Sequence, residues 1–224
     1  MSDVFSFDLA DGLASGQCPL CDALARDERR WFDSFWREGR KDAGARRRFF
    51  AGGGFCRRHA WLLHDLVAEQ SAGRAIADIY GALADRDLAA LDDVLAGARD
   101  RRRKGDKPLL LREAACSACI AETDALARKA HFFVELLATV AGRERYERSH
   151  GLCFTHLLSA LDAAGKDDEA ALYLIGDWRR RLEEVRRRLS EFDRKRDYRY
   201  AGERQEDERR SWTDVIRRYV GDAP

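Results

Sequence analysis

Four short cysteine motifs, arranged as two copies of one pattern, constrain this chain more than any other feature of its sequence. The segment CPLC recurs 98 positions later as CSAC, and GFCRRH recurs 97 positions later as GLCFTH. All six cysteines of the chain belong to this pattern. The sequence therefore predicts a duplicated unit, in which each copy carries Cys-x-x-Cys and then Gly-x-Cys-x-x-His, with the third cysteine 35 or 34 positions after the second.

Each copy supplies three cysteines and one histidine, a set that suits a tetrahedral metal ion. Residues i and i+3 of a helix share one face, so both side chains of a motif can turn onto one ion. Thiolates in a first helical turn are favoured by the helix dipole, and the preceding glycine lets the backbone bend tightly. The predicted ligands are, in chain order, Cys18, Cys21, Cys56, His59, Cys116, Cys119, Cys153 and His156.

The pairing of the four motifs is a separate question. We expect each site to form within one copy, because the helical hairpin between its two motifs is just long enough to return to its start. Cys18 and Cys21 would then meet Cys56 and His59. The competing geometry joins the copies, so that CPLC meets GLCFTH.

The ligand types also bear on the metal and its role. Thiolate and imidazole donors favour zinc, two ions per chain, over an iron–sulfur cluster, which usually has four cysteine ligands. Four protein ligands per ion are typical of a structural site, whereas catalytic zinc keeps one position open. No Ser/His/Asp set, phosphate-binding glycine loop or paired carboxylates stand out, so no catalytic residue is assigned and an enzyme is the less favoured class. His64, His131 and His150 do not repeat, and we expect them to be structural, with only His150 near a site.

Helical periodicity dominates the chain and predicts an all-α fold of helical-hairpin units, each held by a Cys3His site, with a C-terminal helical extension. Helices are expected from CPLC to Gly39, just before Gly52, from 56 to about 95 with Gly73 as a candidate break, and over about 115–141, 152–164, 167–196 and 206–220. The expected domains are a first repeat at 1–99, a linker at 100–108, a second repeat at 109–165, and charged helices at 166–224 that pack on the repeats. Burial under Trp31, Phe55 and Trp61 is expected to protect the first site.

The charge balance and the length of the apolar stretches disfavour two classes of protein, nucleic-acid binders and membrane proteins. Lys plus Arg number 41 against 40 Asp plus Glu, and this balance argues against a dedicated nucleic-acid binder. The most apolar stretch, HFFVELLATVAG, is shorter than the roughly 20 residues of a membrane span, and the first residues lack the pattern of a signal peptide. We therefore expect no membrane association and a cytoplasmic protein, in which clustered cysteines more often bind metal than form disulfides. The sequence identifies neither a protein partner nor an oligomeric state.

The paired motifs, CPLC with GFCRRHAW and CSAC with GLCFTH, resemble those of an uncharacterised bacterial family of helical proteins. The closing DYRYAGERQEDERRSWTDVIRRYVG is similar to the C-terminal stretch of that family. The resemblance covers nearly the whole chain and implies metal ligands at the eight matching positions, but it brings no established activity. The second copy departs from the first, because CSAC lacks the proline and no tryptophan follows His156.

Three functions are compatible with these observations. The leading hypothesis is a non-enzymatic zinc-binding protein that serves as an interaction or regulatory module. The first alternative is a redox protein, either an iron–sulfur carrier or a thiol-based zinc switch. The second is a nucleic-acid-binding regulator that uses the zinc units as scaffolds.

Overall fold

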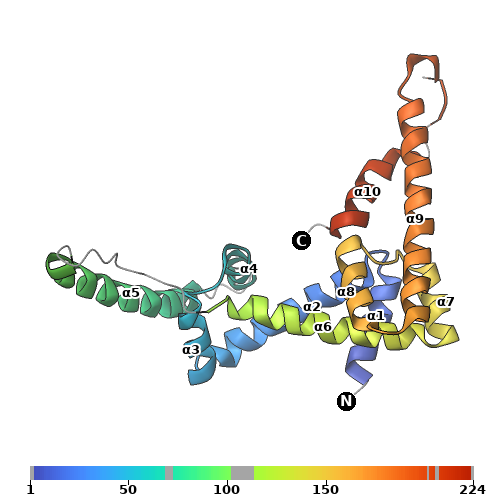
Figure 1. Ribbon diagram of the computed structural model, residues 1–224. Coiled ribbons are helices and arrows are strands. Elements are labelled where there is room, and N and C mark those ends of the chain that lie inside the picture. The colour runs from blue at the N-terminus through green and yellow to red at the C-terminus, as the bar shows by residue number, and fades with distance from the viewer. Residues whose placement is uncertain (1–2, 69–72, 102–113, 201, 205–206, 223–224) are drawn as a thin grey trace. The chain divides into compact units, whose positions relative to one another are not determined.

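The computed structural model describes residues 3–68, 73–101, 114–200, 202–204 and 207–222, and these residues form helices and connecting turns without a strand (Figure 1). The α-helices are α1 (Asp3–Ala14), α2 (Pro19–Ser34), α3 (Ala43–Ala51), α4 (Arg57–Ala68), α5 (Gly73–Arg101), α6 (Ser117–Leu137), α7 (Val140–Arg148), α8 (Phe154–Ala164), α9 (Asp168–Arg194) and α10 (Ser211–Val220). A π-helical turn, Phe35–Gly39, extends α2, and 3-10 turns lie at Tyr198–Tyr200 and Asp207–Arg210. The predicted all-α class is confirmed.

Two features of the helix order were not predicted. The first is α1, and the second is the break that separates α7 from α6. Thr139 causes this break, because its extended backbone and its side chain, which accepts the Gly142 N–H, start a new helix. The predicted linker at 100–108 lies mostly outside the described residues.

The chain divides into two compact units. Unit 1 comprises Met1–Asp27 and Asp124–Pro224, and unit 2 comprises Glu28–Thr123. The unit boundaries fall within α2 and α6. They do not coincide with the repeats expected at 1–99 and 109–165. The units also contain different sets of helices, so the duplication of the motifs does not extend to a clear pair of equivalent hairpins.

Unit 1 has an apolar core in which Leu9, Leu20, Phe133 and Leu174 are almost fully buried. These residues come from α1, α2, α6 and α9, helices that are far apart in the sequence. Helices α8, α9 and α10 contact one another pairwise (Figure 1). Tyr146 of α7 is fully buried in the same core, and its hydroxyl accepts the Leu152 N–H. The core thereby holds the residue that precedes Cys153.

Unit 2 has an aromatic core around Phe55. The Phe55 ring makes edge contacts with Phe32, Phe35 and Phe49 at centroid distances of 5.0 to 5.3 Å. Such contacts add to the apolar area that these rings bury. Phe32 and Phe35 lie three residues apart on one face of the helix and are both buried. Because Phe55 directly precedes Cys56, this core fixes the start of α4.

Candidate metal centres

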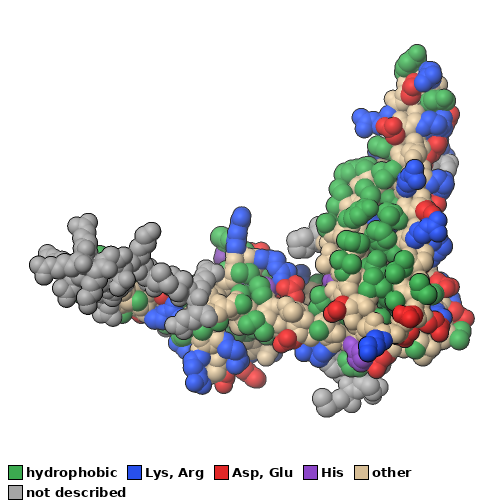
Figure 2. Space-filling view, viewed as in Figure 1, with side chains coloured by type: hydrophobic (Ala, Val, Ile, Leu, Met, Phe, Trp, Pro, Cys, Tyr) green, Lys and Arg blue, Asp and Glu red, His purple; other side chains and the backbone are tan. Residues whose placement is uncertain are grey.

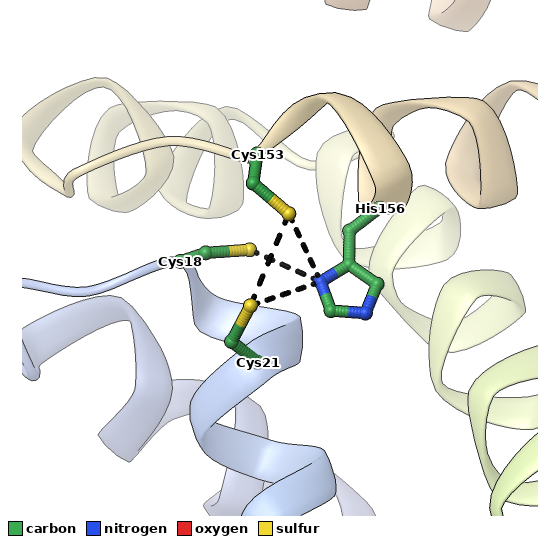
Figure 3. A group of neighbouring side chains, drawn as sticks. All are labelled: Cys18, Cys21, Cys153 and His156. Carbon is green, nitrogen blue, oxygen red and sulfur yellow. Dashed lines mark hydrogen bonds between the residues drawn. The ribbon is translucent and has the colours of Figure 1, made fainter. Parts of the chain in front are cut away.

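The eight predicted ligands gather into two clusters, each with three cysteines and one histidine. Site A consists of Cys18, Cys21, Cys153 and His156 and lies within unit 1 (Figure 3). Site B consists of Cys56, His59, Cys116 and Cys119 and lies within unit 2. In each cluster the four donor atoms lie within 4.8 Å of one another.

The predicted pairing is wrong. Each site takes its Cys-x-x-Cys motif from one copy and its Cys-x-x-His motif from the other. The outer motifs of the chain meet in site A, and the inner motifs meet in site B. The competing geometry considered above, in which CPLC meets GLCFTH, is the one observed.

The donor atoms of site A have the spacing of a tetrahedral metal shell. His156 Nδ1 lies 3.4, 3.3 and 3.4 Å from the sulfurs of Cys18, Cys21 and Cys153. The sulfurs of Cys21 and Cys153 are 3.9 Å apart. Zinc bonds of about 2.3 Å to sulfur and about 2.0 Å to nitrogen imply tetrahedral edges of about 3.8 Å and about 3.5 Å. The observed edges agree with these values.

Site B has the same dimensions. His59 Nδ1 lies 3.2, 3.6 and 3.3 Å from the sulfurs of Cys56, Cys116 and Cys119. The sulfurs of Cys56 and Cys119 are 3.7 Å apart. Both histidines therefore present Nδ1 to the sulfurs, and each set of four donors surrounds a space of the size that one ion requires. The residues present fit zinc at both sites.

All four motifs lie at helix starts, as predicted. The carbonyl of the first cysteine in each motif accepts the first helical hydrogen bond, with N–O distances of 2.8 to 3.1 Å. The helices that begin there are α2, α4, α6 and α8. Two helix N-termini thus point their unpaired N–H groups toward each site. A zinc ion with three thiolates and a neutral imidazole has a net charge of −1, which these helix ends stabilise.

A glycine two residues before each Cys-x-x-His pair turns the backbone into the site. Gly54 has a φ of 84° and Gly151 has a φ of 79°, conformations that favour glycine over residues with a side chain. A Cβ atom on Gly151 would also lie 2.6 Å from the Arg181 side chain. The role predicted for both glycines is confirmed.

Two arginines hold the loop that carries Cys153. Arg181 of α9 donates hydrogen bonds to the carbonyls of Ser149, Tyr146 and Glu147 and is anchored by the buried carboxylate of Asp177. Arg218 of α10 is itself buried and donates to the carbonyls of His150 and Leu152. Neither arginine belongs to the repeated motifs, so the repeats gave no indication of them.

The end of α10 covers site A. Gly221 has a φ of 85°, and a Cβ atom there would lie 2.6 Å from the Cys21 sulfur and 3.7 Å from the Cys153 sulfur. The next residue, Asp222, accepts the Cys18 N–H and pairs with Arg217. Only a glycine fits against the sulfurs in this conformation.

Site B has a carboxylate behind its histidine. The Nε2 atom of His59 lies 2.9 Å from Glu28 Oε1 and 3.8 Å from Glu122 Oε2. Arg58 bridges the two carboxylates. A carboxylate at the second ring nitrogen fixes the tautomer and the ring orientation of a metal-bound histidine. The hydrogen bond with His59 and the charge of Arg58 outweigh burial and lower the pKa of Glu28, so it is ionised and suited to this role.

The protonation of site A follows from the contacts among its donors. Hydrogen bonds from Cys18 and Cys21 hold the pKa of Cys153 far below its usual range. Burial lowers the pKa of His156, but hydrogen bonds with Cys153 and Cys18 outweigh it and raise that pKa to about 10. Without metal the site therefore contains a Cys153 thiolate beside a protonated His156. A bound cation replaces the protons, so metal binding releases protons to solvent.

Site B has a comparable distribution of charge. Burial raises the pKa of Cys56, but hydrogen bonds with His59 and Cys119 outweigh it and lower the pKa to about 7. Burial and the hydrogen bond with Cys56 raise the pKa of Cys119 to about 12. Burial lowers the pKa of His59, but Glu28 and Cys116 raise it to about 9.

The other singled-out residues lie outside both clusters. His64 and His131 are exposed, and their rings face Asp65 and Glu135. Of the aromatics expected to cover the first site, Phe55 is buried and Trp31 packs on the core of unit 2, but Trp61 is 61% exposed. The expectation of burial under Trp61 is therefore wrong.

The arginine runs of α9 are interleaved with acids in space as well as in sequence. Arg179 pairs with Glu183, and Arg187 pairs with Glu184. These exposed pairs are spaced by one helical turn, as expected for a solvated charged helix face. Across the described residues, no helix has the length and apolar character needed to cross a membrane.

Comparison with known proteins adds no relative, because no protein-family model, curated protein or solved structure matches this chain. The family resemblance of the motifs is therefore not supported by an independent match.

Proposed function

We propose that this chain is a non-enzymatic zinc-binding protein in which site A and site B each hold one structural zinc ion. The observation that carries the proposal is the tetrahedral spacing of four protein donors at both sites. Four donors complete the coordination of zinc and leave no position for a substrate or an activated water. Zinc would supply cross-links between helix starts that are distant in the sequence, and so would stabilise the fold.

The same geometry favours zinc over an iron–sulfur cluster. The donors of each site fit a single ion, whereas the ligands of a cluster bind different irons and must lie farther apart. None of the six cysteines forms a disulfide, as expected for a protein in a reducing compartment such as the cytoplasm. Because four protein ligands leave no open position on the metal, the sites suit an interaction or regulatory module better than an enzyme.

Elemental analysis of protein purified without oxygen tests this function. We expect about two zinc ions per chain, one for each cluster. Stoichiometric iron with sulfide, or one ion shared by two chains, would contradict the proposal. Chelation should also reduce helicity, because binding energy at a structural site is folding energy.

A thiol-based zinc switch is the second candidate, and one observation favours it. Cys56 is half-buried and has a pKa near 7, so a reactive thiolate is present near neutral pH once the metal has left. A switch requires that oxidation release zinc reversibly while most helices remain. A structural site requires that helicity and zinc be lost together.

A further inference from the structure

Helix α10 is amphipathic, but it directs its polar side toward the protein and its apolar side outward. Ser211 and Arg218, seven residues apart on one face, are 0% and 6% exposed. Ser211 donates a hydrogen bond to the Glu208 carbonyl, and Arg218 donates to the loop before Cys153. Among the described residues, α10 contributes none to the buried apolar core of either unit. The buried face of α10 is therefore held mainly by polar contacts, while Tyr219, at the edge of its apolar side, packs against Phe154 and Trp178.

The outward side of α10 is continuous with exposed apolar side chains of α8 and α9. Figure 2 shows hydrophobic side chains gathered over these three helices. Rings from all three meet there, since Phe154 lies 5.4 Å from Trp178 and 6.1 Å from Tyr219 between centroids. We call this surface the apolar patch, and its exposed members are Phe154, Leu158, Ile175, Trp212, Ile216 and Tyr219.

The size of the apolar patch suits a stable protein interface. Its six members are each 39 to 54% exposed. Large side chains carry roughly 150–250 Å² each, so the patch, with its half-buried neighbours, offers on the order of 600 Å² of apolar surface. This is at the upper end of the largest patches on monomers, roughly 300–600 Å², and approaches the roughly 800 Å² that each partner buries in a standard interface.

The charges around the apolar patch indicate what covers it. Asp214 pairs with Arg188, and Arg217 pairs with Asp222. Arg218 donates to carbonyls, so every charged residue of α10 has a partner within unit 1. The charged residues of α10 therefore present no unpaired charge that would select an oppositely charged protein. A chain of net charge +1 also repels its own copy only weakly.

We propose that the apolar patch is the interface of a symmetric dimer of this chain. The α10 stripe of Trp212, Ile216 and Tyr219 follows i, i+4, i+7 spacing, so a copy related by a two-fold axis presents the same stripe to it. The six apolar side chains then bury one another. This inference goes beyond the proposed function and does not depend on which metal occupies site A.

Sedimentation velocity of the full, metal-loaded chain over a range of concentrations tests the proposal. We expect a dimer that dissociates on dilution, and Ile216→Asp should weaken dimerisation by at least about 30-fold, since a central interface side chain contributes that much. Val140→Asp is the control, because Val140 is also an exposed β-branched apolar residue, 76% exposed against 54% for Ile216, but lies on α7, outside the patch. Its dimer should persist.

Circular dichroism and metal content, measured on the same samples, show that both variants are folded. A wild-type chain that stays monomeric at all concentrations overturns the proposal. So does a dimer that Ile216→Asp and Val140→Asp leave equally intact. A dimer that contains no zinc would contradict the proposed function and would leave this inference standing.

Discussion

At the scale of single residues, both metal sites depend on residues that are not ligands. Glu28 contacts the ligand His59 of site B, Arg218 holds the loop before Cys153, and Gly221 lies against the sulfurs of site A. Each acts through a contact with a residue at least 31 positions away in the sequence. Only the fold brings such residues to the sites, so the repeated spacing that predicts the eight ligands does not predict these three.

The contact between Glu28 and His59 gives the first prediction. Glu28→Gln should lower the zinc affinity of site B by about 10- to 100-fold, because an amide orients the ring less strongly than a carboxylate does. Competition with a chromophoric chelator measures this affinity. Glu122→Gln is the control, and its effect should be smaller because Glu122 lies 3.8 Å from the ring instead of 2.9 Å. Equal effects of the two substitutions would show that Glu28 has no special role.

The second prediction concerns the metal-free thiols of site B. The pKa of Cys56 is about 7, below the ordinary value of 9, so its thiolate persists as the pH falls and is lost only below 7. The pKa of Cys119 is raised to about 12, so this thiol stays protonated at neutral pH. Alkylation followed by peptide mass spectrometry should therefore modify Cys56 with a midpoint near pH 7, while Cys119 reacts only at much higher pH.

His59 supports the low pKa of Cys56 through its hydrogen bonds and its charge. His59→Ala keeps the backbone N–H but removes the side-chain hydrogen bond and the charge of the ring, so it should move the alkylation midpoint of Cys56 partway upward, toward 9. A midpoint that does not change in this variant would show that the histidine side chain is not a cause.

At the scale of helices and motifs, the sequence predicted the helix starts correctly and their pairing wrongly. The expectation of pairing within a copy relied on a short return path of about 35 residues. The observed path between Cys21 and Cys153 is 132 residues. Loop-closure entropy grows only with the logarithm of length, so two doublings cost about 1 kcal/mol. Packing in each unit outweighs a term of that size, and spacing alone cannot decide the pairing.

Paired serine substitutions provide the third prediction. Cys21→Ser with Cys153→Ser removes two ligands of site A, so the double variant should retain about one zinc ion per chain. Cys21→Ser with Cys56→Ser removes one ligand from each site and should leave close to none. Pairing within each copy would give the reverse order, so metal content alone distinguishes the two arrangements.

At the scale of the whole molecule, each site serves one unit, and each unit should depend on its own metal. Cys56→Ser should loosen unit 2, which contains site B, and leave unit 1 folded. His64→Ala is the control and should change little, because His64 is exposed and outside both clusters. Hydrogen exchange followed by mass spectrometry resolves the two units. Loss of protection in both units at once would contradict this independence.

The last prediction separates a structural role from a switch by comparing the two sites under oxidation. Site A has two fully buried cysteines and is covered by Gly221, whereas two of the three cysteines of site B are half-buried. Peroxide reacts with accessible thiolates, so site B should release its zinc first and site A should release it more slowly. A metal-sensitive dye and circular dichroism record zinc and helix content together. Because the metal links helix starts, we expect helicity to fall with each release. Rapid release that a reductant reverses, with helicity unchanged, would instead identify site B as a thiol switch.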